Sequence, residues 1–408
     1  MATTDPLIVG LDPGTYKICV VVAENVAGRP EIVGVGTAAS SGIRKGVVVN
    51  IDATVESIRR AVEEAEIMAG CDIRSVMVAV DGCHLRGFNS HGIVAVKNKE
   101  VSVGDIERVL DAARAVALPM DREVLHVLPQ EYIIDEQDGI QEPMGMVGVR
   151  LEARVHIVTG AVTSAQNLMK CCRRVGLHVT GLFAGSLAAA EAVLTPEERQ
   201  LGVALVDMGG GSTNLLICRG GAVRHTAVLP LGGGHLTEDI AAGLRTPVAE
   251  AEKLKQRYGC AVPAAVRRDE TIEVPGMGGR EPRLVRRQIL GKIIEPRFDE
   301  ILTLVAEEMA RVGYGDGLAC GVVLTGGSAI LEGAATIAER VFKAPVRIGN
   351  PLEMGGLVDA VNSPMYSTAV GLVLHALRRR EGGRGRALNG GRLVDMRDRI
   401  VEWLRGLL

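Results

Sequence analysis

The stretch "LIVGLDPGTYKICVVV" at residues 7–22 returns later in the chain as "VALVDMGGGSTNLLIC" at residues 203–218. Each stretch has an apolar run, an Asp, a glycine-containing turn with a hydroxyl residue, and a second apolar run. This order predicts two strands joined by a tight turn. The repeat predicts two related halves, each presenting one such hairpin. A third element, "CGVVLTGGSAIL" at residues 320–331, predicts a strand that ends in Gly326, Gly327 and Ser328 before a helix.

Glycine-rich turns of this kind can hold phosphate groups, because backbone N–H groups approach closely where no Cβ intervenes. Mg²⁺ at phosphates takes one or two carboxylates and keeps much of its water. An Asp before each turn and a hydroxyl after it meet both needs, although a single such turn would be an ordinary hairpin. The candidate phosphate-binding residues are Asp12, Gly14, Thr15 and Lys17 in the first half and Asp207, Gly209, Gly210, Gly211, Ser212 and Thr213 in the second. Asp12 and Asp207 are also the candidate metal ligands, and the absence of GxxxxGK[ST] excludes a P-loop protein.

The composition indicates a globular protein of two or more domains, because 408 residues exceed one comfortable core. With 47% apolar but only 2% aromatic residues, the core must consist of aliphatic side chains. A formal charge of −3 argues against a basic nucleic-acid binder, so no nucleic-acid partner is expected. We see no signal peptide and no uncharged apolar run of membrane-spanning length, and we expect a cytoplasmic protein.

These motifs resemble the phosphate 1, phosphate 2 and adenosine motifs of the actin-like ATPase superfamily. Within it the chain resembles the FtsA family of bacterial cell-division proteins, from Leu7 through Leu408. The most specific stretch is "REVLHVLPQEYIIDEQDGIQEPMGMVGVRLEARVHIVTG" at 122–160. Further support comes from "RHTAVLPLGGGHLTEDIAAGLRTPVAEAEKLKQRYG" at 224–259 and "IIEPRFDEIL" at 293–302.

The resemblance implies an α/β, actin-like two-lobed fold of duplicated RNase H-like domains, with a C-terminal amphipathic helix. Subdomains 1A and 2A would carry the two hairpins. The expected divisions are 1–83, 162–200 and about 360–378 for subdomain 1A, 84–161 for 1C, 201–228 and 313–359 for 2A, 229–312 for 2B, 379–391 for a flexible linker and 392–408 for the membrane-targeting helix.

The resemblance also implies ATP and Mg²⁺ as ligands, with adenine between "TGGS" and the helix "PVAEAEKLKQRYG". Glu250 and Lys253 match its purine-contacting pattern, although the pair could equally be an exposed i,i+3 salt bridge. Gly233 and Gly234, before the next helix, are expected to point N–H groups at the phosphates unless they form a simple loop. Related chaperone ATPases have a water-orienting carboxylate where this chain has Gly185, so we expect ATP binding with at most slow hydrolysis.

The last 17 residues, 392–408, have apolar side chains at spacings of three and four, which predicts an amphipathic helix. The apolar stripe consists of Leu393, Met396, Ile400, Trp403, Leu404 and Leu407. At ~1.5 Å per residue the helix is about 25 Å long, and it is too charged to span a bilayer. Its Trp, its glycine-rich tether and five arginines at 378–386 favour an anionic membrane surface over packing on its own body.

The family resemblance implies a peripheral protein at the division site, on the cytoplasmic face of the membrane. It would polymerise with itself, hold the C-terminal peptide of the tubulin-like FtsZ on subdomain 2B, and recruit later division proteins through 1C. The residues predicted to bind FtsZ are Arg286, Arg287, Arg297, Phe298 and Ile301, whose alternative is a solvated helix face. A PilM-like pilus-assembly scaffold is the competing interpretation. A metabolic kinase or a bare MreB-like filament protein fits less well.

Overall fold

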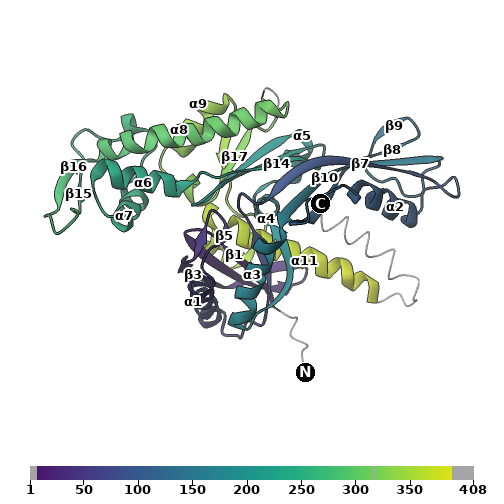
Figure 1. The fold of residues 1–408 in the computed structure, drawn as a ribbon, viewed down its shortest axis with the longest axis horizontal. Helices are drawn as coiled ribbons and strands as arrows, with labels where there is room; N and C mark the ends of the chain where they lie inside the picture. Colours follow the sequence, from purple (N-terminus) through teal and green to yellow (C-terminus); the bar gives the residue numbers. More distant parts are fainter. Residues whose placement is uncertain (1–6, 316–317, 388–408) are drawn as a thin grey trace.

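The computed structural model describes residues 7–315 and 318–387, which form two lobes and a lateral extension (Figure 1). The first lobe contains a six-stranded sheet, in which β1 and β2 form an antiparallel hairpin and β1 pairs in parallel with β6. In sheet order its strands are β11 (His178–Ala184), β6 (Ser75–Val80), β1 (Ile8–Pro13), β2 (Lys17–Val26), β3 (Arg29–Ala39) and β19 (Gly355–Gly356).

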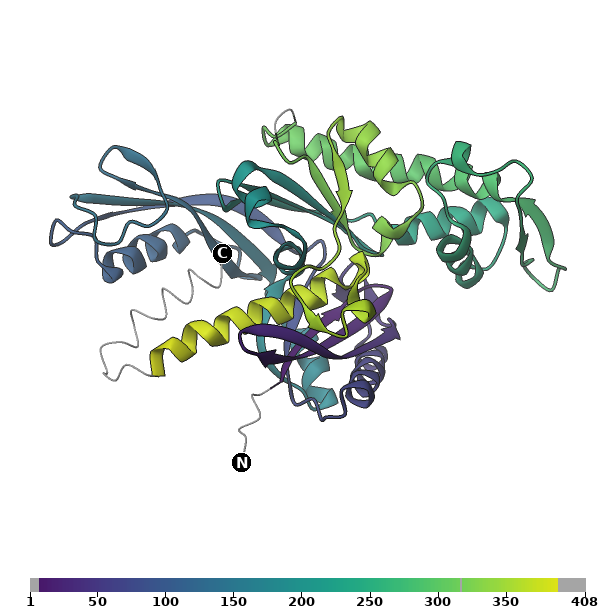
Figure 2. The ribbon, with the colours of Figure 1, turned by 180° about the vertical axis from the view of Figure 1, so that it is seen from behind.

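Helices cover both faces of this sheet (Figure 2). On one face α1 packs on β3 and on α3, and on the other α11 packs on α4 and β1. Close approach is possible because Gly36 faces the backbone of α1 and Gly10 that of α11, where a Cβ would collide. The remaining elements are α1 (Ile51–Ala69), α3 (Val162–Val175), α4 (Gly185–Val193), α10 (Val358–Val361), η3 (Pro364–Tyr366), α11 (Ser367–Ala387) and the small pair β4 (Ile43–Arg44) and β5 (Val47–Val48).

The second lobe repeats this plan around a five-stranded sheet. The strands β12 and β13 form an antiparallel hairpin with Asp207 opposite Asn214, and β12 pairs in parallel with β17. The repeat in the sequence therefore corresponds to a repeat in the fold. The sheet order is β14 (Ala222–Leu229), β13 (Thr213–Arg219), β12 (Val203–Met208), β17 (Val322–Thr325) and β18 (Val346–Ile348), with α5 (Pro196–Leu201), η2 (Gly327–Ile330) and α9 (Ala334–Phe342) beside it.

A helical unit forms the outer end of the second lobe (Figure 1). The long helix α8 packs on α6 and α9, and Leu290, Ile294, Phe298 and Ile301 on its inner face are fully buried. The unit consists of α6 (Gly233–Leu244), α7 (Val248–Tyr258), η1 (Pro263–Ala265), β15 (Thr271–Val274), β16 (Arg283–Arg286) and α8 (Arg287–Arg311).

The lateral extension is a four-stranded sheet with its own core, inserted between β6 and α3. Its order is β7 (Arg86–Ala95), β10 (Arg150–Ala161), β8 (Arg122–Ile134) and β9 (Gln137–Ile140), with α2 (Val103–Arg114) packed on it. Although both its ends emerge from the first lobe, it is hydrogen-bonded to β14 of the second. Gln130 Nε2 donates to the carbonyls of Val223 and Arg224, and a ring nitrogen of buried His156 lies 2.8 Å from Thr226 Oγ1.

The helix α11 continues through residue 387, so the expectation that a flexible linker begins at 379 is wrong. Contacts of its side chains with the first lobe explain this: Arg378 pairs with Glu191, and Arg380 donates to the Leu7 carbonyl. These two arginines are therefore engaged with the protein itself, although the sequence suggested lipid. The rest of the linker and the apolar stripe from Leu393 to Leu407 lie outside the described residues. Among the helices in the described ranges, none is long and apolar enough to cross a membrane.

Candidate functional site

A cleft of about 600 Å³ lies between the two hairpins. This volume is typical of sites for small molecules and cofactors. Of the residues predicted for the nucleotide site, those lining it are Asp12, Gly14, Thr15, Lys17, Asp207, Gly209, Gly210, Gly211, Ser212, Gly233, Gly326, Gly327 and Ser328. The structure therefore brings the two hairpins and the strand–Gly–Gly element together, as the motifs predicted.

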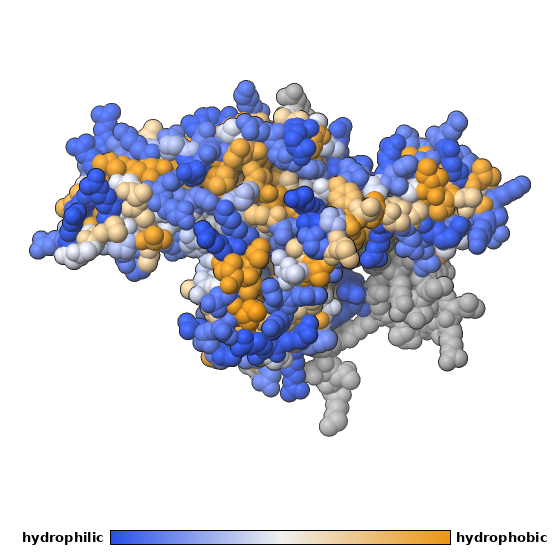
Figure 3. All heavy atoms as spheres, in the orientation of Figure 1, coloured by the Kyte–Doolittle hydropathy of each residue, from blue (hydrophilic) through white to orange (hydrophobic). Residues whose placement is uncertain are grey.

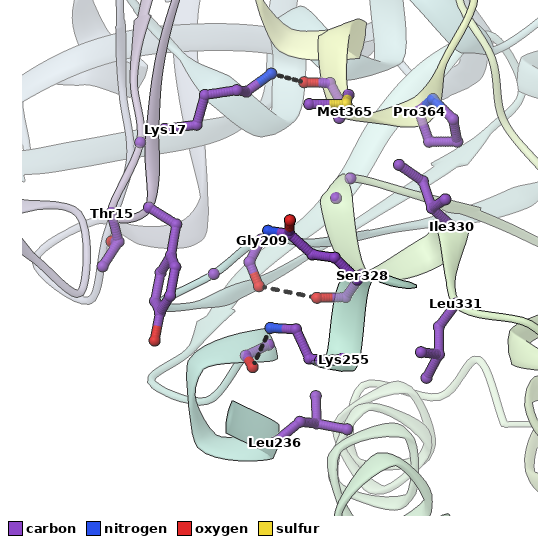
Figure 4. Close-up of a pocket in the computed structure, with 18 of the residues that line it drawn as sticks. Thr15, Lys17, Gly209, Leu236, Lys255, Ser328, Ile330, Leu331, Pro364 and Met365 are labelled. Atoms are coloured by element: carbon purple, nitrogen blue, oxygen red, sulfur yellow. Dashed lines mark hydrogen bonds between the residues drawn. The ribbon is translucent and has the colours of Figure 1, made fainter. Parts of the chain in front are cut away.

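The β1–β2 turn contributes Thr15 and Lys17 from the first lobe (Figure 4). Thr15 Oγ1 accepts a hydrogen bond from the Gly46 N–H at 3.1 Å, which fixes the turn against the loop between β4 and β5. Lys17 Nζ donates to the Met365 carbonyl at 2.7 Å and lies 4.2 Å from the centre of the Tyr366 ring. This ammonium group is the cation that the first hairpin supplies to the cleft.

The β12–β13 turn approaches the first hairpin so closely that only glycine fits. A Cβ on Gly211 would lie 2.5 Å from Thr15 Oγ1, and one on Gly210 would lie 2.5 Å from the Tyr16 ring. Gly326 has φ +86°, and a Cβ there would overlap the Asp207 carboxylate. Ser328 Oγ donates to the Gly209 carbonyl at 3.4 Å (Figure 4). The glycines thus allow three chain segments to meet around the carboxylates.

Three aspartates, Asp12, Asp81 and Asp207, line the cleft where the two hairpins meet. Burial raises the pKa of Asp12 and of Asp207 to about 6. In the opposite direction, the charge of Lys17 lowers the pKa of Asp12, and the hydrogen bond from Asn214 lowers the pKa of Asp207. Burial and then the two other carboxylates hold the pKa of Asp81 well above its usual range. The repulsion among these carboxylates is removed by protonation, by a bound cation, or by a ligand that carries a cation with it.

Sequence reasoning missed Asp81 and Asn214. Asn214 Nδ2 donates to Asp81 Oδ1 at 3.1 Å and to Asp207 Oδ2 at 3.3 Å, while its Oδ1 is buried without a hydrogen-bond partner. A signal for Asp81 was present: it ends the strand "SVMVAV", which runs parallel to β1. Side chains that follow neighbouring parallel strands meet at one edge of the sheet.

The helix α7 presents a different face to the cleft from the one expected. Glu250 and Lys253 pair with each other at 2.8 Å outside the cleft, in the exposed salt bridge considered as the alternative. Glu252 and Lys255, two residues further along, line the cleft instead. Lys255 Nζ donates to the Gly233 carbonyl at 2.9 Å (Figure 4). It also donates to Thr237 Oγ1 at 2.8 Å.

The N–H groups of Gly233 and Gly234 do not point into the cleft. They donate to the carbonyls of Gly209 and Gly210 at 2.9 and 2.7 Å, and a phosphate contact by these two residues stays a prediction. Thr213 is also turned away from the cleft, because its buried hydroxyl donates to the Leu231 carbonyl at 2.8 Å. These three hydrogen bonds help to fix the position of the β12–β13 turn.

The residues predicted for FtsZ binding are scattered. Phe298 and Ile301 are fully buried, so the expectation that they offer apolar contact at the surface is wrong. Arg287 lines the nucleotide-sized cleft and pairs with Glu270 and Glu332. The other two predicted residues are reachable: Arg297 pairs with Asp239 at 2.7 Å and with Glu300, and Arg286 is exposed at the end of β16.

Comparisons with known proteins agree on one family. The family model described as cell division protein FtsA matches residues 204–371, and that of the SHS2 domain inserted in FtsA matches residues 82–159. The chain is 50% identical over 407 residues to the cell division protein FtsA of Pseudomonas aeruginosa, with 98% of each chain covered. It is 43% identical to that of Escherichia coli K12 with 99% of each covered, and 40% identical to that of Bacillus subtilis with 91% and 84% covered.

Solved structures resemble the fold at much lower identity. A PilM–PilN type IV pilus biogenesis complex matches with a TM-score of 0.67 at 18% identity, covering 91% of this chain and 98% of the other. MreB5 of Spiroplasma citri bound to ADP matches with a TM-score of 0.52 at 14% identity, covering 92% and 98%. These likenesses support the actin-like fold predicted from the sequence.

Proposed function

The chain belongs to the FtsA family of cell-division proteins and has an actin-like fold, and from this premise we propose that it binds ATP between its two hairpins. The observation that carries the proposal is the meeting of two Asp-tipped, glycine-lined turns across one cleft. Actin-like structures of MreB5 bound to ADP and to AMPPNP, which share this fold, support it. The triphosphate would lie against the turns at Gly14–Thr15 and Gly209–Ser212, with the base towards Lys255 and Arg287.

The carboxylates fit a magnesium ion that accompanies the nucleotide. Mg²⁺ at phosphate sites takes one or two carboxylates together with phosphate oxygens and waters. Asp12 and Asp207 supply such carboxylates, and the unpartnered Asn214 Oδ1 is a further oxygen beside them. In the described ranges no three His, Cys, Asp or Glu side chains group tightly enough to hold an ion alone. When bound, the ion neutralises phosphate charge.

Gly327 allows a sharp test of nucleotide binding. It lines the cleft, and a Cβ there would meet no atom within 4 Å. Gly327→Leu should therefore fill the cleft without disturbing the fold and weaken binding of a fluorescent ATP analogue by about tenfold or more, ~1.4 kcal/mol. Gly104→Leu, on the exposed start of α2 where the nearest atom lies at 3.9 Å, is the matched control. Unchanged affinity in Gly327→Leu would rule out this cleft as the site.

We further propose that the protein tethers FtsZ to the cytoplasmic face of the membrane at the division site, as a peripheral protein and as a filament of its own copies. The apolar stripe of residues 392–408 supplies the membrane contact in this proposal. FtsZ would be held on the helical unit at 229–312, proposed as subdomain 2B. There, exposed Arg286 and Arg283 flank Leu284, whose surface is 75% accessible. Such a surface suits an acidic peptide with apolar side chains.

The inserted sheet at 84–161, proposed as subdomain 1C, offers a second partner surface. Figure 3 shows apolar side chains gathered on this part of the molecule. Towards its outer end Ile93, Met144, Val147 and Val149 are 39–77% exposed. We propose that later division proteins bind here. The remaining expected divisions, 1–83 with 162–200 and about 360–378 for 1A and 201–228 with 313–359 for 2A, complete the proposed arrangement.

Liposome co-sedimentation tests the membrane step. Full-length protein should pellet with vesicles that contain anionic lipid, and Trp403→Glu should abolish this because it places a charge in the apolar stripe. Glu402→Gln, on the opposite polar face, should leave pelleting intact. If Trp403→Glu pellets as well as the wild type does, the stripe is not the membrane anchor. The likeness to PilM, at 18% identity, extends to the fold alone.

A further inference from the structure

Asp81 occupies a distinctive position in the cleft. It follows β6, the strand beside β1, and it lies where both hairpin turns converge. Its neighbours Asp12 and Asp207 are the carboxylates assigned to the metal ion. Nothing in the proposed binding of nucleotide uses Asp81, and burying a third carboxylate among two others is costly.

The position of Asp81 relative to Gly185 indicates a role for the Asp81 carboxylate. Gly185 begins α4, and a Cβ at this position would overlap Oδ2, Cγ and Oδ1 of Asp81. The carboxylate thus fills the space that a side chain at 185 would occupy. The family resemblance implies a water-orienting carboxylate at this position in related ATPases, and the lack of a side chain on Gly185 was the reason to expect slow hydrolysis. In this protein the carboxylate beside α4 belongs to Asp81, which follows the neighbouring strand β6.

Two features hold the Asp81 carboxylate in this place. Asn214 Nδ2 donates to its Oδ1 at 3.1 Å and ties it to Asp207. At the start of α4 the first N–H groups have no partner within the helix and the helix dipole is positive, which favours a negative charge beside Gly185.

We propose that Asp81 is the catalytic residue that orients the attacking water for ATP hydrolysis, which rests on the proposed binding of ATP in this cleft. The water donates a hydrogen bond to the Asp81 carboxylate, and its oxygen forms a bond with the terminal phosphorus. The bond from that phosphorus to the bridging oxygen breaks, and ADP leaves with the electron pair. Both protons of the water end on inorganic phosphate, so atoms and charge balance.

The test compares Asp81→Asn with wild type in single-turnover phosphate release and in binding of a fluorescent ATP analogue. The expected result is a fall of about 100-fold in the hydrolysis rate, with nucleotide affinity changed less than ~3-fold. Asp72→Asn, in an exposed carboxylate just before the same strand, should hydrolyse at the wild-type rate. Equal rates in Asp81→Asn and wild type would overturn the inference. So would binding without any hydrolysis by the wild type.

A readout without nucleotide separates a catalytic role from a structural one. Since Asp81 is one of three crowded carboxylates, Asp81→Asn should raise the melting temperature of the nucleotide-free protein near pH 8. A lowered melting temperature would show that Asp81 stabilises the fold, and would contradict the proposal. Failure of the wild type to bind the analogue at all would instead contradict the proposed function itself.

Discussion

At the scale of single residues, Asp81 and Gly185 share one small volume at the start of α4. Gly185→Ala should therefore destabilise the protein by roughly 1–3 kcal/mol, the usual cost of overpacking. Most of this cost should disappear when Asp81 is also changed to Gly, because the colliding atoms belong to that side chain. Urea unfolding of the two single variants and the double variant measures the coupling.

The control for this cycle is Gly181→Ala on β11. A Cβ there would lie 3.7 Å from its nearest neighbours, which is ordinary contact, so stability should hardly change. If Gly185→Ala is as stable as Gly181→Ala, the Asp81 carboxylate does not fill the space beside α4.

The crowded carboxylates also predict a pH dependence. The pKa of Asp207 rises from 3.8 unfolded to about 6 folded, mainly through burial. The folded protein thus binds the proton more tightly, so the free energy of unfolding falls as pH rises from about 4 to about 6 and stays lower above that. Asp207→Asn should remove up to roughly 3 kcal/mol of this fall. Thermal melts of nucleotide-free protein across this range measure it; a pH profile parallel to that of wild type and of Asp72→Asn would refute the prediction.

The types of residue and their order in the sequence predicted much of this candidate site. Contacts between residues that are distant in the sequence could not be predicted in this way. Asp12 and Asp207 were recognisable because each precedes a glycine turn in a repeated pattern. Asp81 lacks a partner motif, and its role depends on the register of β6 against β1 and on Gly185, which is far away in the sequence. Phe298 and Ile301 were misjudged because the buried face of α8 is set by packing, not by the local sequence.

At the scale of elements, the hairpins were predictable and the rotation of α7 was not. Both hairpins carry their own turn chemistry, whereas the face of a helix that meets a cleft is decided by its neighbours. Since residues on a helix are 100° apart, Glu250 and Lys253 lie on one side and Glu252 and Lys255 on another. The helix α11 similarly extends further than its glycines suggest, because Arg378 and Arg380 hold it against the first lobe.

This difference in face gives a prediction with an internal control. Lys255 is largely buried and donates to Gly233, Thr237 and Glu252, so Lys255→Ala should lower the affinity for an ATP analogue by about tenfold and reduce thermal stability. Lys253→Ala removes an exposed ion pair two residues away and should change either quantity by less than ~0.5 kcal/mol. Equal losses in the two variants would contradict the proposal that this face of α7 meets the nucleotide.

At the scale of the whole molecule, nucleotide binding and membrane attachment should be linked. A single amphipathic helix binds lipid weakly, whereas many helices on one filament bind together through their high effective concentration. If filaments need ATP, Gly327→Leu should pellet with anionic vesicles several-fold less than wild type at equal concentration. Gly104→Leu should behave as wild type. Equal pelleting of Gly327→Leu and wild type, with and without ATP, would show that assembly does not strengthen attachment.

The inserted sheet leaves the first lobe through β7 and returns to it through α3, yet its polar contacts at Gln130 and His156 are with β14 of the second lobe. A rotation of one lobe relative to the other must therefore either break these hydrogen bonds or move the inserted sheet together with β14. The inserted sheet is thus covalently connected to the first lobe and hydrogen-bonded to the second. A rotation between the lobes would displace the outer end of the sheet furthest. A rotation of a few degrees between the lobes would therefore displace the exposed apolar side chains at the outer end of the inserted sheet.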